Sequence, residues 1–344
     1  MPTITVPKIH CPLPSAFSPH AEAAESHVAE WATRFGLSGA LLGLRKNRVG
    51  HLSAYVHPQA SAEAVKVGAV WTAWLFAYDD LLVEPIRDND DDQLARVARV
   101  QSRILAALSG SPAEPAAPRK AAAEAVTGSI VAAARDIRSS ILAVNPSWEP
   151  GPFIQDLSAF LCSNLWEIGN SRRGRPPRIG VYLPMRRQTS AFFPSYRVSA
   201  ALASVRLPRE VSNHLAVREL ENMACNYGSW LNDLFSFERE QAEGGVHSLV
   251  RIVQREHGCG AQEAAEHVAD MCRTEIESYL ELKSRLPEMG LDVTGELKRH
   301  LALLESWMSG VVEWYQMSPR YNERRHTSGT SHPASEAAVP TPQA

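Results

Sequence analysis

The sequence of 344 residues has almost no excess charge of either sign, and this lack bears on what the protein binds. Lysine and arginine number 35 against 38 aspartate and glutamate residues, which gives a net charge of −3. A near balance provides no electrostatic basis for binding nucleic acid or an anionic membrane surface. The sequence therefore predicts neither a nucleic-acid partner nor a membrane partner.

Cysteine pairs, long apolar runs and a targeting signal are also lacking. The N-terminus shows no basic start followed by an apolar core, and no apolar run approaches the roughly 18 residues that span a bilayer. The cysteines are odd in number and form no CxxC pair. They are Cys11, Cys162, Cys225, Cys259 and Cys272. We therefore expect a soluble, cytoplasmic protein with reduced thiols.

Strand signals are missing as well, since neither a series of alternating apolar residues nor an Asn-Gly hairpin occurs. Apolar residues instead recur at helical spacing, which predicts an all-α fold. The 44% of hydrophobic residues is enough to bury a large core. We expect helices over residues 21–36, 59–82, 92–108, 119–142, 152–169, 182–203, 208–241, 247–258, 261–285 and 293–317.

The breaks between these helices are too short to be domain linkers, which predicts one domain over residues 19–323. Residues 1–18 are rich in proline and are expected to form an extended strap. Residues 324–344 are poor in large apolar residues and rich in Ser, Thr, Pro and Ala, which predicts a disordered tail.

The stretch NDLFSFERE places Asn232, Ser236 and Glu240 on one stripe of a helix, because they stand four residues apart. An amide carbonyl, a hydroxyl and a carboxylate suit a hard divalent cation such as Mg²⁺. A polar stripe can also be a solvated face. The aromatic and apolar flanks favour burial, where polar oxygens must be paired or bound. Arg239 adds a positive charge beside the stripe.

A second acidic cluster, Asp79, Asp80 and Glu84, ends a helix that is rich in aromatic residues. Carboxylates buried there without cations are costly, and a metal would remove that cost. Pro85 biases Glu84 away from α geometry, so the last turn can open and redirect it. The alternative is that the acids simply end the helix in solvent.

Basic residues elsewhere suit a diphosphate. Arg186 lies in YLPMRRQTSAFF, and Arg320 with Tyr321 follows the last predicted helix. Guanidinium groups bind diphosphate oxygens in a bidentate manner, and a tyrosine hydroxyl can add a donor. Each alone is commonly a surface residue or a structural ion pair. Together with the two oxygen-rich clusters, they indicate a diphosphate site.

These motifs together resemble the bacterial class I terpene synthases, single-domain enzymes that cyclise linear isoprenoid diphosphates. DDLLVE at 79–84 resembles the first metal motif of that family, DDxxxE, and NDLFSFERE at 232–240 matches the second, NDxxSxxxE. Arg186 lies 46 positions before Asn232, as the diphosphate-sensing arginine of the family does. Arg320 and Tyr321 match its C-terminal Arg-Tyr pair. The resemblance extends from about Pro12 to Tyr321.

The resemblance implies a helical bundle around an apolar cavity that holds three Mg²⁺ ions. Asp79 and Glu84 would bind metal on one wall, whereas Asp80 would pair with a basic residue. The implied metal ligands on the other wall are Asn232, Ser236 and Glu240. The implied diphosphate-binding residues are Arg186, Arg239, Arg320 and Tyr321.

Two positions depart from the pattern of the family. Thr189 and Ser190 occupy the places of the linker and effector residues that follow the sensor, where the effector is commonly glycine. Because the effector is thought to act through its backbone carbonyl, Ser190 bears on the product more than on activity. Arg239 replaces the usual lysine, which keeps the charge but changes its geometry.

Aromatic faces in such a cavity stabilise carbocations by cation–π attraction. Phe76 and Trp314 are the expected catalytic aromatics, because both lie near the predicted motifs. Other aromatic residues are expected to belong to the ordinary core. They are Trp71, Trp74, Phe192 and Trp307.

The function we expect is the Mg²⁺-dependent ionisation and cyclisation of a prenyl diphosphate, with farnesyl diphosphate giving a sesquiterpene. A substrate of geranyl or geranylgeranyl diphosphate is the alternative. A chain-elongating prenyl diphosphate synthase would carry two DDxxD motifs and is disfavoured by the Asn-Ser-Glu set. A non-catalytic helical scaffold, with the charged groups as ion pairs, also stays open. So does the quaternary state, although proteins of this family are often homodimers.

Overall fold

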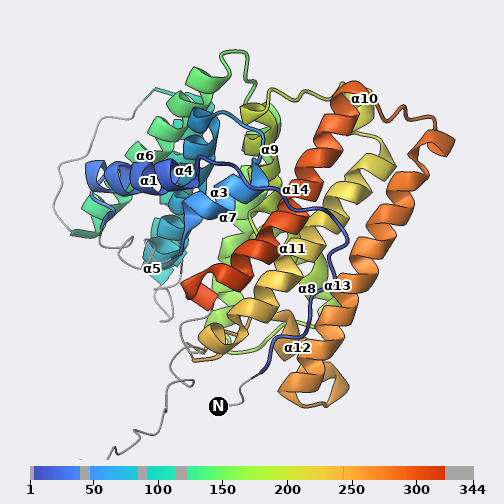
Figure 1. Cartoon of the computed structure of the whole chain (residues 1–344). Coiled ribbons are helices and arrows are strands. Elements are labelled where there is room, and N and C mark those ends of the chain that lie inside the picture. Colours follow the sequence, from blue (N-terminus) through green and yellow to red (C-terminus); the bar gives the residue numbers. More distant parts are fainter. Residues whose placement is uncertain (1–3, 39–46, 84–90, 113–121, 243, 322–344) are drawn as a thin grey trace, which may run out of the picture.

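The computed structural model describes residues 4–38, 47–83, 91–112, 122–242 and 244–321, and every regular element in these ranges is helical (Figure 1). This confirms the all-α expectation. The longer helices are α1 (Ala21–Arg34), α4 (Ala62–Tyr78), α5 (Asp91–Ser109), α6 (Ala122–Val144), α7 (Gly151–Arg172), α11 (Leu215–Ala242), α13 (Ala261–Ser284) and α14 (Gly295–Met317). The shorter ones are α3 (Val49–Val56), α8 (Ile179–Thr189), α9 (Phe192–Leu202), α10 (Arg209–Ser212) and α12 (Leu249–His257), with a π-helical turn at Asp79–Val83 and a 3₁₀ turn at Leu286–Met289.

The core has two halves that meet along α3 and α9. One half packs α1, α4, α5, α6 and α7, and the other packs α8 and α11–α14. Figure 1 shows them on either side of α3 and α9. Residues of α9 belong to both, since Val198 packs with the first half and Tyr196 with the second. Two helices shared between the halves tie them into one bundle, and apolar burial is the main favourable term that holds it together.

Two predicted helices are broken in the structure. The helix expected over 182–203 is divided into α8 and α9, and the one expected over 208–241 into α10 and α11. The second break falls at Asn213 and His214, where the His214 ring accepts a hydrogen bond from Ala216 N at 3.2 Å. Polar side chains that bond the nearby backbone compete with helical pairing, which explains the break.

Helix α3 was not predicted, and its burial explains why. Seven of its eight residues are buried, so its sequence shows no amphipathic period. Gly50 lies so close to α1 that a Cβ atom there would come within 2.7 Å of Glu25 N. This contact requires glycine and brings α3 directly against α1.

The N-terminal segment from Ile4 to Ser18 contains no regular element and packs on the half of the core that contains α11. Ile4 N donates to Glu238 Oε1 at 3.0 Å, and the Tyr227 hydroxyl donates to His10 O at 2.8 Å. Ser18 N donates to a carbonyl of α3 at 3.1 Å. The predicted strap therefore follows α11 to α3. Residues 324–344, the predicted tail, lie outside the described residues.

None of the helices in the described part of the chain combines the length and the apolar character that crossing a bilayer requires.

Candidate active site

A cavity of about 230 Å³ opens between α4, α7, α8, α11 and α14, and it brings most of the predicted site residues together. Its lining includes Asp79, Phe76, Arg186, Thr189, Ser190, Asn232, Arg239, Glu240, Trp314, Arg320 and Tyr321. Glu84, the predicted partner of Asp79, lies outside the described residues. Ser236 is fully buried just behind Asn232, and its hydroxyl donates to the Asn232 carbonyl at 2.6 Å.

One wall of the cavity begins where α4 ends. Ser61 caps the start of α4 through its hydroxyl, which accepts from Ala64 N at 3.3 Å, and the helix then runs as a mostly buried segment to Tyr78. At Asp79 the α-helix gives way to a π-helical turn. Such turns change the direction of side chains and often occur at functional sites. Regular α geometry is therefore lost from Asp79 to Val83. The opening that we expected from Pro85 concerns Glu84, and both residues lie outside the described part of the chain.

Asp80 and Arg320 form an ion pair at the mouth of the cavity, with 3.6 Å between Oδ1 and Nη2. The Arg320 guanidinium carbon lies 4.7 Å from the centre of the Phe76 ring, whose other neighbour is the stacked ring of Trp314 at 6.1 Å. The pairing of Asp80 with a basic residue agrees with what the resemblance implies. Phe76 already holds one cation on its face, which shows that the ring is placed for cation–π contact.

On the opposite wall, Arg186 is held by the second metal motif. Its Nε donates to Asp233 Oδ1 and its Nη2 to Asn232 Oδ1, both at 2.9 Å. Asn232 Nδ2 in turn donates to the Tyr321 hydroxyl at 3.2 Å. One hydrogen-bonded chain therefore joins α8, α11 and the residues that follow α14.

Asp233 is a site residue that our sequence reasoning did not single out. Its carboxylate also accepts from the Tyr182 hydroxyl at 2.7 Å and from Leu249 N at 2.9 Å. With only 1% of its side chain exposed, it needs these three partners to stay charged. The sequence did contain a signal for this role, because Asp233 is the second residue of the NDxxSxxxE motif and directly follows the predicted ligand Asn232. Asp233 fixes the orientation of Arg186.

The break between α8 and α9 places the predicted linker and effector residues on the cavity wall. Ala191 adopts the left-handed conformation at φ 60°, which costs an alanine roughly 1–2 kcal/mol and ends α8. Pro194 has no N–H with which to bond the Ser190 carbonyl four residues earlier. The predicted continuous helix was wrong here because nothing in the residue type of Ala191 marks the turn.

Thr189 stands between two ionisable groups. Arg186 Nη1 lies 3.5 Å from its hydroxyl, and Glu167 of α7 also bonds it. Burial raises the pKa of Glu167 to about 7, although the nearby Arg186 opposes the shift. Glu167 lines the cavity and was not predicted, because it lies far from every motif in the sequence.

The deeper walls of the cavity are aromatic. Phe192 and Trp307 line it, so these two are not only core, whereas Trp71 and Trp74 are buried away from it. The indole N–H of Trp71 donates to Ser195 and that of Trp74 to Ile130 O. The remaining lining residues that were not predicted are Leu52, Thr72, Leu75, Phe160, Ala191, Ser195, His247, Val311 and Tyr315.

The polar atoms at the mouth suit a bound cation. Burial raises the pKa of Glu240 to about 7 despite the Arg239 guanidinium at 3.9 Å, and Glu240 Oε2 has no hydrogen-bond partner among the described residues. Burial also lowers the pKa of His247 to about 4, which leaves a neutral imidazole. A covered carboxylate oxygen without a donor needs a cation to offset the cost of its burial.

The described residues contain no group of three or more His, Cys, Asp or Glu side chains placed to share a metal ion. The expected ligand set explains this result, because it uses the amide of Asn232 and the hydroxyl of Ser236. Oxygen donors of this mixed kind are typical for Mg²⁺, which takes its other ligands from phosphate and water.

Comparison with known proteins identifies the family. The model of terpene synthase family 2, C-terminal metal binding, matches residues 70–278. The chain is 28% identical over 312 residues to the (+)-T-muurolol synthase of Roseiflexus castenholzii, covering 90% of this chain and 92% of that one. It is 25% identical over 330 residues to the germacrene A synthase of Nostoc punctiforme, with 94% and 97% covered.

The fold agrees with this result. The solved structure of germacradien-4-ol synthase from Streptomyces citricolor matches with a TM-score of 0.74 at 22% identity, over 90% of this chain and 100% of that one. The matched family segment includes Asp79, Arg186 and the whole stretch from Asn232 to Glu240. The chain therefore belongs to the metal-binding terpene synthases of family 2 and is a class I terpene synthase.

Proposed function

We propose that the protein ionises farnesyl diphosphate and cyclises the product cation to a sesquiterpene, with release of diphosphate. The observation that carries the proposal is that one cavity holds both predicted motifs. Asp79 lies on one wall, Asn232 and Glu240 lie on the other, and aromatic side chains line the space below them. Relatives from Roseiflexus castenholzii and Streptosporangium roseum are named as synthases that cyclise (2E,6E)-farnesyl diphosphate. A C15 substrate is therefore favoured over C10 and C20 substrates.

The oxygen donors at the mouth fit Mg²⁺. Asp79 would hold it on one wall, and Asn232, Ser236 and Glu240 on the other, with Glu84 as a further ligand outside the described residues. Three ions are proposed. When bound, Mg²⁺ neutralises negative charge that grows on the diphosphate as the C–O bond breaks.

The basic residues would bind the diphosphate. Asp233 holds Arg186 Nε at 2.9 Å, which points the guanidinium toward the mouth and limits the freedom lost on binding. Arg320 and Tyr321 follow α14, and Arg239 comes from α11. Positive groups fixed in advance around the leaving group stabilise the charge that develops on it, which is the largest source of rate in reactions of this kind.

The aromatic lining would then guide the carbocation. Phe76 and Trp314 face the mouth, and Phe192 and Trp307 extend the lining. A desolvated cation–π contact contributes about 2 kcal/mol or more, and apolar walls exclude water that would quench the cation. The Ser190 carbonyl, which lacks a helical donor at Pro194, offers a partial negative charge in the same lining. Proton loss to the released diphosphate, or capture by water, ends the reaction.

The test is turnover with defined substrates. Purified protein is incubated with Mg²⁺ and geranyl, farnesyl or geranylgeranyl diphosphate, and a hexane extract is analysed by gas chromatography. We expect a cyclic C15 product from farnesyl diphosphate. Longer diphosphates would instead indicate chain elongation, and no turnover with any substrate would favour the helical scaffold and refute the proposal.

A further inference from the structure

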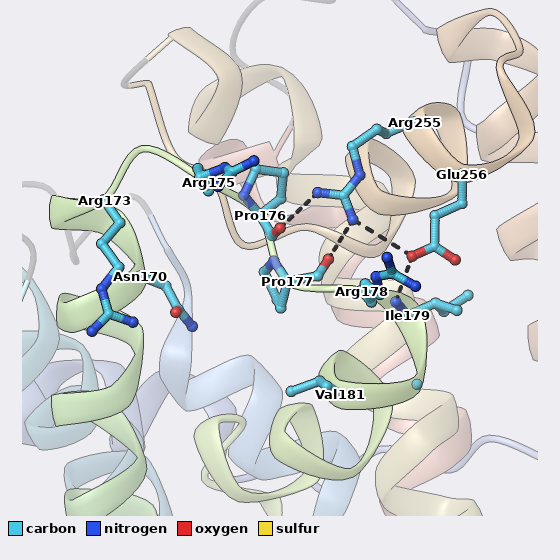
Figure 2. Close-up of a pocket in the computed structure, with 11 residues that line it drawn as sticks. Asn170, Arg173, Arg175, Pro176, Pro177, Arg178, Ile179, Val181, Arg255 and Glu256 are labelled. Carbon is cyan, nitrogen blue, oxygen red and sulfur yellow. Dashed lines mark hydrogen bonds and ion pairs between the residues drawn. The ribbon is translucent and has the colours of Figure 1, made fainter.

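A second hollow lies on the surface where α7, α8 and α12 meet (Figure 2). It has a volume of about 1000 Å³ and is formed by the connection 173–178, together with Asn170 of α7, the start of α8 and the end of α12. Four arginines and one glutamate line it. We call it the arginine groove.

The backbone of the groove is held in place by α12. Arg255 donates from Nη1 to Pro176 O at 2.6 Å and from Nη2 to Pro177 O at 2.7 Å. Its neighbour Glu256 accepts from Ile179 N at 2.8 Å, and Figure 2 shows these contacts crossing the groove. Two prolines restrict the backbone further. The connection is therefore a built surface, and its arginine side chains extend from a fixed backbone.

The remaining three arginines carry charge that the described part of the chain does not neutralise. Arg173, Arg175 and Arg178 are exposed, and none has an ion-pair or hydrogen-bond partner among the described residues. Asn170 adds an amide nitrogen, Nδ2, that is buried without a hydrogen-bond partner within the same residues. Donors thus outnumber acceptors, which is the pattern of an anion site.

An apolar strip lies beside these donors. Pro176, Pro177, Ile179 and Val181 line the same groove, and Val181 is 49% exposed although it stands on a helix. Cationic donors next to apolar surface fit a ligand that has an anionic head and a hydrocarbon chain. A prenyl diphosphate is such a ligand, and guanidinium groups bind its phosphates in a bidentate manner.

The arginine groove adjoins the active-site cavity. Glu167 lines the cavity, and Asn170, less than one helical turn further along α7, lines the groove. His247 lines the cavity, and its Nδ1 lies 3.5 Å from the hydroxyl of Ser171, which directly follows Asn170. On α8, Val181 faces the groove and Arg186 the cavity. The two hollows thus share both α7 and α8.

We propose that the arginine groove binds the prenyl diphosphate outside the cavity before it enters, an inference that rests on the proposed function. Arg173, Arg175 and Arg178 hold the diphosphate, while Ile179 and Val181 contact the hydrocarbon chain. Because the charge of the whole protein is nearly balanced, attraction of an anionic substrate depends on a local cationic surface of this kind.

The binding test uses the thio analogue of farnesyl diphosphate, whose bridging sulfur prevents ionisation. The protein is titrated calorimetrically in EDTA, so that no metal supports binding in the cavity. Replacing Arg173, Arg175 and Arg178 by glutamine should weaken binding about tenfold, because three exposed charge contacts are lost together. The matched control replaces Arg103, Arg209 and Arg218, which are exposed on other elements, and should change binding less than twofold.

A second variant tests the hydrocarbon contact. Val181→Asp places a carboxylate in the apolar strip and should weaken binding of the analogue about as much as the triple change does. Inorganic diphosphate should bind wild-type protein more weakly than the analogue. Equal affinity for the two ligands, or full binding by the triple variant, would overturn the proposal.

A membrane is the other anionic surface to be tested. Sedimentation with phosphatidylglycerol vesicles that depends on the three arginines, without binding of the analogue, would replace the substrate by a lipid and contradict the proposal. If the wild-type protein binds the analogue in the groove but forms no cyclic product, the proposed cyclase function is refuted and the proposed binding in the groove is supported. If cyclic product forms but the triple change does not weaken binding of the analogue, the cyclase function is supported and the binding in the groove is refuted.

Discussion

Helix α11 contains two covered glutamates in opposite states. Near its start, Glu221 is 8% exposed and accepts from Arg197 Nη1 at 2.7 Å and Nη2 at 2.8 Å, with His300 Nε2 at 2.9 Å. Near its end, Glu240 is 22% exposed, and one of its oxygens has no hydrogen-bond partner among the described residues. Burial alone would raise the pKa of Glu221, yet the Arg197 guanidinium and the hydrogen bonds from Arg197 and His300 hold that pKa at about 2. Burial raises the pKa of Glu240 to about 7.

The difference separates a structural carboxylate from a carboxylate that awaits a ligand. Glu221 has its cation inside the protein, through Arg197, which also bonds Asp156 of α7 at 2.8 Å and so ties α7, α9, α11 and α14 together. Glu240 faces the cavity, and we propose that its cation is a metal ion bound together with the substrate. Both glutamates lie on one helix, so the helical spacing of the sequence does not distinguish the structural carboxylate from the one at the cavity. The groups that contact each carboxylate do distinguish them.

The largest expected effect is on catalysis. Glu240→Ala should lower kcat by about 10³-fold or more, because it removes a metal ligand at the leaving group. The circular dichroism spectrum and the unfolding midpoint should stay close to those of the wild type. Steady-state assays with farnesyl diphosphate and Mg²⁺ measure the effect, and retention of most of the activity would remove Glu240 from the metal site.

Glu221→Ala should act on stability instead. It leaves the half-buried Arg197 with only Asp156. Breaking a fully buried ion pair typically costs about 3–5 kcal/mol of unfolding free energy, so the loss here should be at or below the lower end of that range. Urea denaturation followed by circular dichroism measures the loss. The activity of the fraction that remains folded should fall far less than in Glu240→Ala. A stability equal to that of the wild type would contradict the structural role of Glu221.

The pH dependence of stability sharpens the same contrast. The folded pKa of Glu221, about 2, lies below its ordinary value of 4.5, so its contribution is present above pH 4.5 and is lost as the pH falls toward 2. The difference corresponds to about 3 kcal/mol. Urea titrations from pH 7 to pH 3 should show a shallower acid decline in Glu221→Gln than in the wild type. The same decline of stability with falling pH in both proteins would contradict the lowered pKa of Glu221.

The smallest effect concerns ligand binding without turnover. Mg²⁺ together with inorganic diphosphate, at about 100 times the dissociation constant, should stabilise the wild-type protein by about 2.7 kcal/mol, and EDTA should remove this gain. Asn232→Ala should show little of it. Thermal unfolding measures the shift, and an equal shift with diphosphate in EDTA would mean that metal is not needed for binding.

The sequence predicted the parts of the site that depend on local period. Asn232, Ser236 and Glu240 lie on one stripe because helical spacing requires it. The apolar character of α11 predicted burial, and Ser236 is fully buried, whereas Asn232 and Glu240 are half-buried. The π-helical turn at Asp79–Val83 was not predicted. The expectation from Pro85 concerned Glu84, and both residues lie outside the described part of the chain.

Other parts depend on contacts between distant residues and were not predicted. Glu167 joins the cavity only because α7 packs against α8 and α9, and His247 joins it from the segment before α12. The left-handed conformation of Ala191 has no signature in its residue type, because alanine favours helices and adopts this conformation only under tertiary constraint. Pro194, three residues later, was the available signal for a break. Phe192 and Trp307 likewise show which side they face only in the folded bundle.

Anomalous scattering from a crystal grown with Mn²⁺ and inorganic diphosphate tests the central claim most directly, since Mn²⁺ replaces Mg²⁺ and is located by its signal. The account predicts metal peaks between Asp79 and the side chains of Asn232, Ser236 and Glu240, with diphosphate against Arg186 and Arg320, and no peak beside Glu221. Metal or diphosphate bound away from these two walls, with Glu240 Oε2 still without a cation, would contradict it.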